Sequence, residues 1–260
     1  MRIALVDSGI GMLSTAAALH AARPDADLFL SMDPDHMPWG ARTPDAVIGR
    51  ALAGARAAWD AAGGLDAVVV PCNTASVHGL ARLREVFEPS VPVIGTVPAI
   101  KPAARSGGPI AVWSTVATTR SGYQRRLVET FAQDIEVTPV ACAGLAEAVE
   151  SADPREVADA VSYAAGLTPG NVRAVVLGCT HYDLVGEEIV GALGQDVALH
   201  TAAHAVAAQA LRRVGDLPHH GRPGRVRVLA SGRPAELPAA ALTYPAGRSL
   251  MAQGSPARSL

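Results

Sequence analysis

Short apolar runs alternate with longer amphipathic stretches along almost the whole chain. The runs are rich in Val, Ile and Leu and end at turn residues, as buried strands do, whereas the alanine-rich stretches between them carry the periodicity of helices. The pattern predicts strands at 2–6, 27–31, 66–70, 91–94, 110–113, 135–140, 173–177, 197–200 and 225–229, and helices at 13–22, 45–62, 76–87, 121–132, 144–150, 155–165, 184–193 and 202–214. Such alternation favours an α/β fold with mainly parallel sheets flanked by helices.

Part of this pattern occurs twice. Residues 3–8, Ile-Ala-Leu-Val-Asp-Ser, recur as residues 110–115, Ile-Ala-Val-Trp-Ser-Thr, and the offset of 107 (110 − 3) also separates Cys72 from Cys179. Ligands of parallel sheets bind beyond the carboxyl ends of the strands, and both cysteines follow a predicted strand at that end. The repeat predicts two pseudo-symmetric α/β lobes, which we expect to comprise residues 1–97 with 210–260, and residues 98–209.

Composition and charge narrow the possible functions. A net charge of −2 without charged blocks and only 4% aromatic residues disfavour binding of nucleic acid. The apolar runs are far shorter than the roughly 20 residues that span a bilayer. Asp7 comes too early for the apolar region of a signal peptide, so we expect a cytoplasmic protein with no membrane association.

Cysteine and lysine usage bears on cofactors. Three cysteines without a C-x-x-C pair predict neither a disulfide framework nor a zinc site, and we expect no metal. The single lysine, Lys101, precedes Pro102 in an expected loop, which disfavours a cofactor bound as a Schiff base.

Two of the cysteines stand where an apolar run gives way to a polar turn, in Cys72-Asn73-Thr74 and Cys179-Thr180-His181. A lone cysteine is often a core residue, but two at equivalent positions of a repeat, each before a predicted helix, favour chemistry. A thiol can act as base or acid near neutral pH when its surroundings tune its pKa from about 8.5. Two such groups on opposite faces of one carbon can remove a proton from one side and deliver one to the other. The cysteines therefore indicate racemisation, with the polar turns supplying donors to a carboxylate.

Four other positions carry alternative interpretations. Asp7 precedes the small residues Ser8-Gly9-Ile10-Gly11, which let backbone amides approach a ligand, or else Asp7 caps a helix. This Gly-x-Gly lacks the third glycine of a dinucleotide fingerprint. His181 can exchange a proton with a thiol or a substrate, or it is a buried structural histidine. Cys142, which has no repeat counterpart, is expected in the core, and Glu150 alone would be a solvated helix residue.

Four motifs, in order along nearly the whole chain, are similar to those of a known family: Asp7-Ser8-Gly9-Ile10-Gly11, Met37-Pro38-Trp39-Gly40, Cys72-Asn73-Thr74-Ala75 and Gly178-Cys179-Thr180-His181-Tyr182. The chain thereby resembles the cofactor-independent glutamate racemases of the aspartate/glutamate racemase superfamily. The resemblance implies two lobes with the active site in the cleft between them, a small amino-acid substrate and no cofactor. It also implies a homodimer, although no interface can be identified in the sequence.

The resemblance assigns roles to particular residues. It implies that Cys72 acts on the D-enantiomer and Cys179 on the L-enantiomer, with Asp7, His181 and Glu150 assisting proton transfer. The substrate's amino and carboxylate groups would be held by side chains or backbone amides of Ser8, Trp39, Gly40, Asn73, Thr74, Thr118 and Thr180.

Several positions depart from the family's common pattern, and they leave the substrate open. Met12 replaces a glycine, Trp39 a tyrosine and Asp183 a proline, and Cys142 lacks its usual following proline. Trp39 is expected to add bulk near the distal carboxylate of the substrate, and Asp183 adds negative charge if it faces inward. The alternatives are a racemase of another amino acid such as aspartate, a malonate-type decarboxylase, or a non-catalytic amino-acid-binding protein. Decarboxylase relatives keep only one of the two cysteines, whereas this chain has both.

Overall fold

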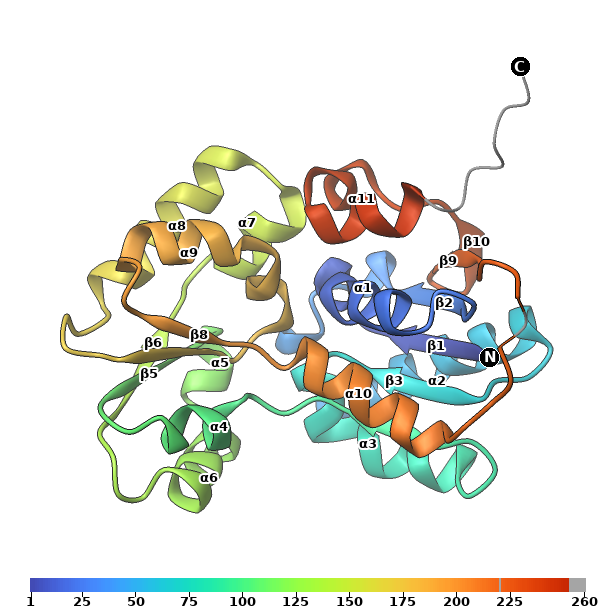
Figure 1. Cartoon of the computed structure of the whole chain (residues 1–260), viewed down its shortest axis with the longest axis horizontal. Coiled ribbons are helices and arrows are strands. Elements are labelled where there is room, and N and C mark those ends of the chain that lie inside the picture. The colour runs from blue at the N-terminus through green and yellow to red at the C-terminus, as the bar shows by residue number, and fades with distance from the viewer. Residues whose placement is uncertain (220, 253–260) are drawn as a thin grey trace. The chain divides into compact units, whose positions relative to one another are not determined.

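The computed structural model describes residues 1–219 and 221–252, and the chain divides into two compact units (Figure 1). The first unit combines Met1–Thr96 with the segment that begins at Ala203, and the second is Val97–Ala202. The return to the first unit thus precedes the expected boundary after residue 209, because the helix that begins at Ala203 packs on the first unit's strands. Residues 251–260 carry no periodic pattern in the sequence, which predicts an irregular tail, and of these residues 253–260 lie outside the described residues.

The first unit is built on a six-stranded sheet with the order β10-β9-β2-β1-β3-β4. Its strands are β1 (Arg2–Val6), β2 (Asp27–Met32), β3 (Ala67–Val70), β4 (Val93–Gly95), β9 (Val226–Ala230) and β10 (Arg233–Ala235). All neighbours pair in parallel except β10, which runs antiparallel to β9. The carboxyl ends of the five parallel strands therefore share one edge of the sheet.

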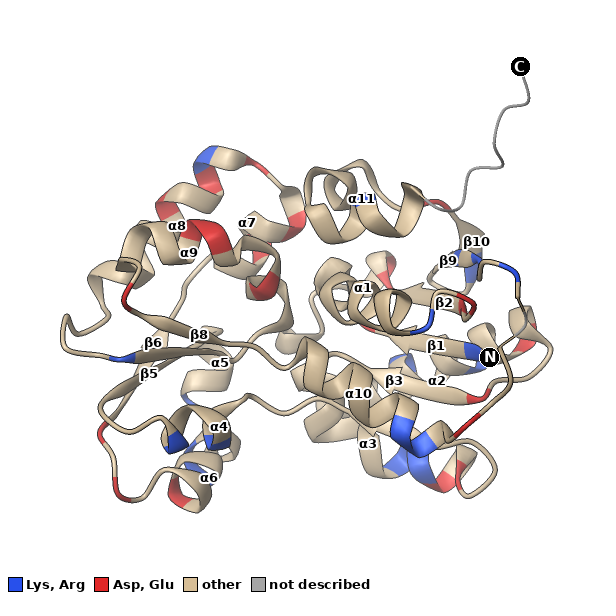
Figure 2. Cartoon of the chain, in the orientation of Figure 1, with Lys and Arg blue, Asp and Glu red and all other residues tan. Residues whose placement is uncertain are grey.

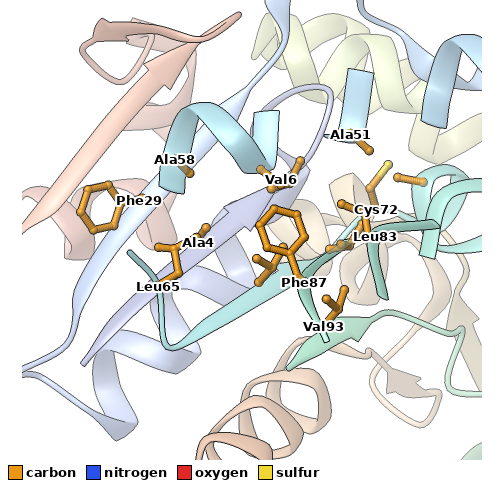
Figure 3. Packing of buried hydrophobic residues seen from close by; sticks show 14 of the residues in the cluster. Ala4, Val6, Phe29, Ala51, Ala58, Leu65, Cys72, Leu83, Phe87 and Val93 are labelled. Atoms are coloured by element: carbon orange, nitrogen blue, oxygen red, sulfur yellow. The ribbon is translucent and has the colours of Figure 1, made fainter. Parts of the chain in front are cut away.

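Helices cover both faces of this sheet: α1 (Leu13–Ala22), α2 (Pro44–Ala62), α3 (Asn73–Phe87), α10 (Ala203–Val214) and α11 (Pro245–Ala252). Alternate strand residues such as Val6 and Val93 pack against α2 and α3 in one buried apolar cluster (Figure 3). The α2 side of the cluster is made of small residues, including Ala51 and Ala58, which lets the helix lie close to the sheet. Short helical turns complete the unit: η1 (Ile10–Met12), η2 (Pro34–His36), η3 (Trp39–Ala41) and η5 (Ala239–Thr243).

The second unit has a four-stranded parallel sheet with the order β6-β5-β7-β8. Its elements are β5 (Ile110–Ser114), β6 (Val137–Ala141), β7 (Ala174–Leu177), β8 (Ala198–His200), α4 (Ile100–Arg105), α5 (Val116–Thr119), α6 (Gly122–Phe131), α7 (Leu145–Ser151), α8 (Pro154–Gly166), η4 (Thr180–Val185) and α9 (Gly186–Leu193). The helices on its two faces differ in charge: α4 and α6 are mainly basic, whereas α7, α8 and α9 are mainly acidic (Figure 2).

The sequence repeat is also a structural repeat. The order β2-β1-β3-β4 in the first unit matches β6-β5-β7-β8 in the second. The pairing register matches as well, because Ile3 lies opposite Ala67, and Ile110 lies opposite Ala174, so both partners are displaced by 107 residues (110 − 3 and 174 − 67). The prediction of two related α/β lobes with mainly parallel sheets is confirmed.

Three local predictions are wrong. The helix after β3 begins at Asn73 and not at 76, so Cys72 is its N-cap residue. Lys101 lies in helix α4 and not in a loop, and Met251 belongs to α11 and not to an irregular tail. Over the part of the chain that the structure describes, no helix combines the length and apolar character needed to cross a membrane.

Candidate active site

In the first unit, the loop after β1 carries Asp7 and Ser8, which are 1% and 8% exposed. The Asp7 amide donates to the carbonyl of Ser31 at the end of β2, over 3.1 Å. The Ser8 amide donates to Asp7 Oδ1 over 2.7 Å. The carboxylate of Asp7 is therefore held by its own loop at the shared edge of the sheet.

The neighbouring strand β3 ends in Cys72-Asn73-Thr74. Cys72 caps helix α3, and its carbonyl accepts from the amide of Ser76 over 2.8 Å. The thiol is 7% exposed and belongs to the apolar cluster between the sheet and its helices (Figure 3). The field at the amino terminus of a helix favours negative charge. The position thus combines a mostly buried thiol with a dipole that stabilises its thiolate, and Asn73 and Thr74, in the first turn of α3, remain partly exposed.

The turn after β2 holds Trp39 and Gly40. The Trp39 indole is 1% exposed, belongs to the same cluster, and donates through Nε1 to Asp33 Oδ2 over 3.1 Å. The ring is therefore a core residue, and the expectation that it adds bulk where the distal carboxylate binds stays a prediction. Gly40 is exposed, and a Cβ atom built on it would lie 3.8 Å from Thr74 Oγ1. The structure thus brings Gly40 beside Thr74.

The second unit places Cys179, His181 and Glu150 in one chain of contacts. Cys179 follows β7 and caps η4, and its Sγ lies 3.8 Å from His181 Nδ1. On the far side of the ring, His181 Nε2 lies 2.7 Å from Glu150 Oε2. Because a carboxylate only accepts hydrogen bonds, Nε2 carries a proton and Nδ1 faces the thiol. The imidazole can therefore take up or return the proton of Cys179 while Glu150 stabilises the positive charge that results.

The other candidates in this unit lie at the same edge of its sheet. Thr180, beside the cysteine, is 9% exposed. Thr118 lies in the short helix α5, where its amide donates to Thr115 Oγ1 over 3.3 Å and its hydroxyl accepts from the same group over 3.0 Å. Thr115 follows β5, which is the strand next to β7.

Burial changes the ionisation of two residues near Cys179. Cys142, after β6, is 2% exposed, and burial raises the pKa of its thiol far above its usual range, which agrees with the core position expected for it. Asp183 in η4 is partly exposed, and burial raises the pKa of its carboxyl to about 7 although His181 opposes the shift. Asp183 therefore holds less negative charge at neutral pH than an ordinary aspartate.

Sequence reasoning missed Asp33. It lies one residue beyond β2, is 7% exposed, and accepts hydrogen bonds from three side chains. Its position beyond a predicted strand is the same signal that drew attention to Asp7. Within residues 1–219 and 221–252, the structure has no group of three His, Cys, Asp or Glu side chains arranged to hold a metal ion.

Comparison with known proteins shows which family has this architecture. The model of the Asp/Glu/Hydantoin racemase family matches residues 8–208, which include both cysteine turns and the chain from Cys179 to Glu150. The chain belongs to this family. Within the family, a glutamate racemase of Roseiflexus sp. (strain RS-1) is 37% identical over 210 residues, which cover 79% of this chain and 76% of that protein.

Other racemases agree over a larger share of the chain. A glutamate racemase of Pseudomonas putida strain KT2440 is 34% identical over 244 residues, 90% of each protein. The crystal structure of Escherichia coli glutamate racemase in complex with L-glutamate and an activator has a TM-score of 0.79 at 26% identity, and the match covers 96% of this chain and 92% of that chain. The family membership thus extends over both units of this racemase-family chain.

Proposed function

We propose that the chain interconverts L-glutamate and D-glutamate by proton transfer at the α-carbon, with Cys72 and Cys179 as the two acid/base groups and without a cofactor. The observation that carries the proposal is the repeated strand pair, which presents one thiol at the same register position in each unit. Glutamate is favoured as the substrate because the curated relatives that align with most of the chain are glutamate racemases.

In the direction from L to D, the thiolate of Cys179 removes the α-proton and becomes a thiol. The carbanionic intermediate then takes a proton from the thiol of Cys72, which is left as a thiolate. The reverse direction uses the same groups in exchanged roles. Each turnover moves one proton onto one sulfur and one proton off the other, so solvent must return the pair to its starting state.

The groups around each thiol have different tasks. His181 and Glu150 take the proton of Cys179 and neutralise the resulting charge, as their contacts of 3.8 and 2.7 Å allow. Asp7 assists on the side of Cys72 from the adjacent strand end. Binding of the substrate's amino and carboxylate groups is assigned to the polar groups at the sheet edges: Ser8, Asn73, Thr74, Thr118, Thr180 and the backbone amides of Trp39 and Gly40.

Proton NMR in D₂O tests this mechanism directly. With the wild-type protein, the α-proton of either enantiomer should be lost and optical activity should decay. With Cys72→Ala, Cys179 can still exchange the α-proton of L-glutamate, but no D-glutamate forms. Cys179→Ala should behave as its mirror image, exchanging only D-glutamate. Cys142→Ala is the matched control, because this thiol is buried and should leave racemisation unchanged.

The same assay separates the rival functions. Racemisation by Cys72→Ala at the parental rate would overturn the two-thiol mechanism. Exchange with aspartate and none with glutamate would correct the substrate, and release of CO₂ from a malonate would indicate a decarboxylase. Binding of glutamate by calorimetry with no loss of the α-proton would indicate a binding protein without catalysis.

A further inference from the structure

Asp33 is the centre of a hydrogen-bond network behind the loop of Asp7. Its Oδ1 accepts from Ser231 Oγ over 2.8 Å and from His36 Nδ1 over 2.9 Å, and its Oδ2 accepts from Trp39 Nε1 over 3.1 Å. Burial raises the pKa of Asp33, but the three donors outweigh this effect and hold the pKa below its usual value. The side chain is therefore an ionised carboxylate whose two oxygens are both engaged.

The backbone of Asp33 ties this network to the first catalytic loop. Its amide donates to the carbonyl of Ser8 over 3.1 Å. A cavity of about 60 Å³ lies between the two loops, and Asp7, Asp33 and Trp39 all line it. The residue whose carboxylate centres the network thus holds, through its own backbone amide, a loop assigned to the substrate.

Trp39 connects the network to a second substrate-binding segment. Its carbonyl accepts from the amide of Arg42 over 3.0 Å, which closes the turn that contains Gly40. Since Gly40 lies beside Thr74, the bond from the indole to Asp33 fixes where this turn meets the amino terminus of α3. Asp33 is not one of the proposed proton-transfer groups, but it bonds two segments assigned to the substrate: the Ser8 loop and the Trp39–Gly40 turn.

The third arm of the network reaches the last parallel strand. Ser231 follows β9 and has a φ of +47°, a conformation that residues other than glycine rarely adopt. Its hydroxyl donates to Asp33 and accepts from the amide of Asp35 over 3.2 Å. A strained residue persists where its surroundings hold it, and here both contacts come from the segment after β2.

We propose that Asp33 is a positioning residue of the racemase: it fixes the Trp39–Gly40 turn and the Ser8 loop so that their backbone groups are aligned for the substrate carboxylate. This inference rests on the proposed function. Removing the Asp33 acceptor should weaken substrate binding in both directions of the reaction while the proton-transfer groups remain in place.

The test compares two variants that break the same bond from opposite ends. Asp33→Asn replaces one of the two acceptor oxygens with an N–H donor, so the three side chains around Asp33 can no longer all be accepted, and Trp39→Phe removes the indole donor. Each should raise KM for both enantiomers about tenfold or more, with kcat within about threefold of wild type. The double variant should raise KM no further than the worse single variant, because both substitutions act on the same bond between the Trp39 indole and Asp33. Ser231→Ala leaves the bond to Trp39 intact and should change KM less.

Asp35→Asn is the matched control, because Asp35 is a neighbouring acid whose carboxylate pairs with exposed Arg233, while the bonds of Asp33 to Trp39 and Ser8 stay intact. It should keep wild-type KM and kcat. Wild-type KM in both Asp33→Asn and Trp39→Phe, whatever their melting temperatures, would overturn the inference and leave the proposed function standing. Absence of racemisation in the wild-type protein and in Asp35→Asn alike would instead be a failure of the proposed function.

Discussion

The ends of β3 and β7 present the same residue at the same register position but surround it differently. Cys72 caps the 15-residue helix α3 and is 7% exposed, whereas Cys179 caps the 6-residue η4 and lies 3.8 Å from an imidazole. At the offset of 107 residues, His181 corresponds to Thr74 (181 − 107), and Asp7 corresponds to Ser114 (7 + 107).

This difference indicates what the repeat preserves and what it does not. The strand ladder and the thiol are common to both units, because they depend on the register of adjacent parallel strands. The groups that we propose to assist each thiol come from positions without an equivalent group in the other unit: Asp7 in the first, and His181 with Glu150 in the second. Under the proposed mechanism, the two enantiomers would therefore react with two acid/base groups in chemically distinct surroundings.

The largest expected effect comes from replacing His181 and its counterpart Thr74 with alanine, each in a separate variant. His181→Ala removes the group that we propose takes the proton of Cys179, and general acid–base catalysis contributes about 10²–10⁴-fold. Since the equilibrium constant of racemisation is one, kcat/KM for both enantiomers must fall together, here by at least about 100-fold. Thr74→Ala should reduce kcat/KM by about tenfold or less, through lost binding. Steady-state polarimetry with each enantiomer measures both, and equal losses in the two variants would refute the asymmetry.

Gly178 supplies the next effect. A Cβ atom at this position would clash with Ser114 Oγ and lie 2.9 Å from the carbonyl oxygen of Trp113. Because the second contact is to backbone, Gly178→Ala should cost about 1–3 kcal/mol of stability and displace the adjacent Cys179. The equivalent residue in the first unit is Pro71 (178 − 107), and Pro71→Ala is the matched variant with a smaller expected loss. Chemical denaturation gives the comparison, and a wild-type midpoint for Gly178→Ala would contradict it.

Asp183 and Ser76 form a third pair at the same offset (183 − 107). The pKa of Asp183 is raised to about 7 in the folded protein, whereas an aspartate in the unfolded chain has a pKa near 4. The folded protein therefore has its full stability below about pH 4, where the carboxyl is neutral in both states, and loses stability as the pH rises toward about 7. Asp183→Asn should therefore match wild type at pH 4 and exceed its stability at pH 8 by about 2 kcal/mol, after discounting for partial exposure.

Ser76 gives the pH-independent counterpart. Its hydroxyl donates to the Val70 carbonyl over 3.0 Å and accepts from the Thr96 amide over 2.9 Å. Ser76→Ala should cost about 1 kcal/mol at every pH, because neither partner titrates. Thermal unfolding from pH 4 to pH 8 distinguishes the two behaviours. A constant difference between Asp183→Asn and wild type would show that the carboxyl ionises normally.

The smallest effect concerns the helices that follow the first strand of each unit. His20 of α1 is 5% exposed, and neither of its ring nitrogens has a hydrogen-bond partner among the described residues. The residue 107 positions later is Leu127 of α6, which packs against the second unit's apolar cluster. His20→Leu should stabilise the protein by about 1 kcal/mol, because a buried polar group without a partner is removed. A lower melting temperature than wild type would indicate a role for the imidazole.

The sequence was sufficient for elements that carry a regular apolar pattern, and for the motifs at their ends. It did not reveal β10, because Arg233-Pro234-Ala235 has no apolar periodicity and is ordered by antiparallel pairing with β9. It did not reveal α4, because a proline at the third position of a short helix also fits a loop. The repeat was visible because the strand pairing that it encodes depends on short, continuous segments.

The missed parts of the site depend on contacts between distant segments. Asp33 is a single acid in the sequence, and its role follows only when Ser231, 198 positions away, reaches its carboxylate. The burial of the Trp39 ring likewise depends on the acceptor that Asp33 offers and on the apolar cluster around the ring. Local sequence propensity cannot predict either of these contacts, because each joins segments that are brought together only by the fold.

The placement of β9 has a consequence for how the protein is made. The second unit is one continuous stretch, Val97–Ala202, so all of its strands are synthesised before β9. The first unit must wait, because β2 pairs with β9 through Leu28 and Val226 and its sheet stays open until that late segment arrives. During synthesis, the half with His181 is therefore complete while the half with Cys72 still exposes the edge of β2 to the cell.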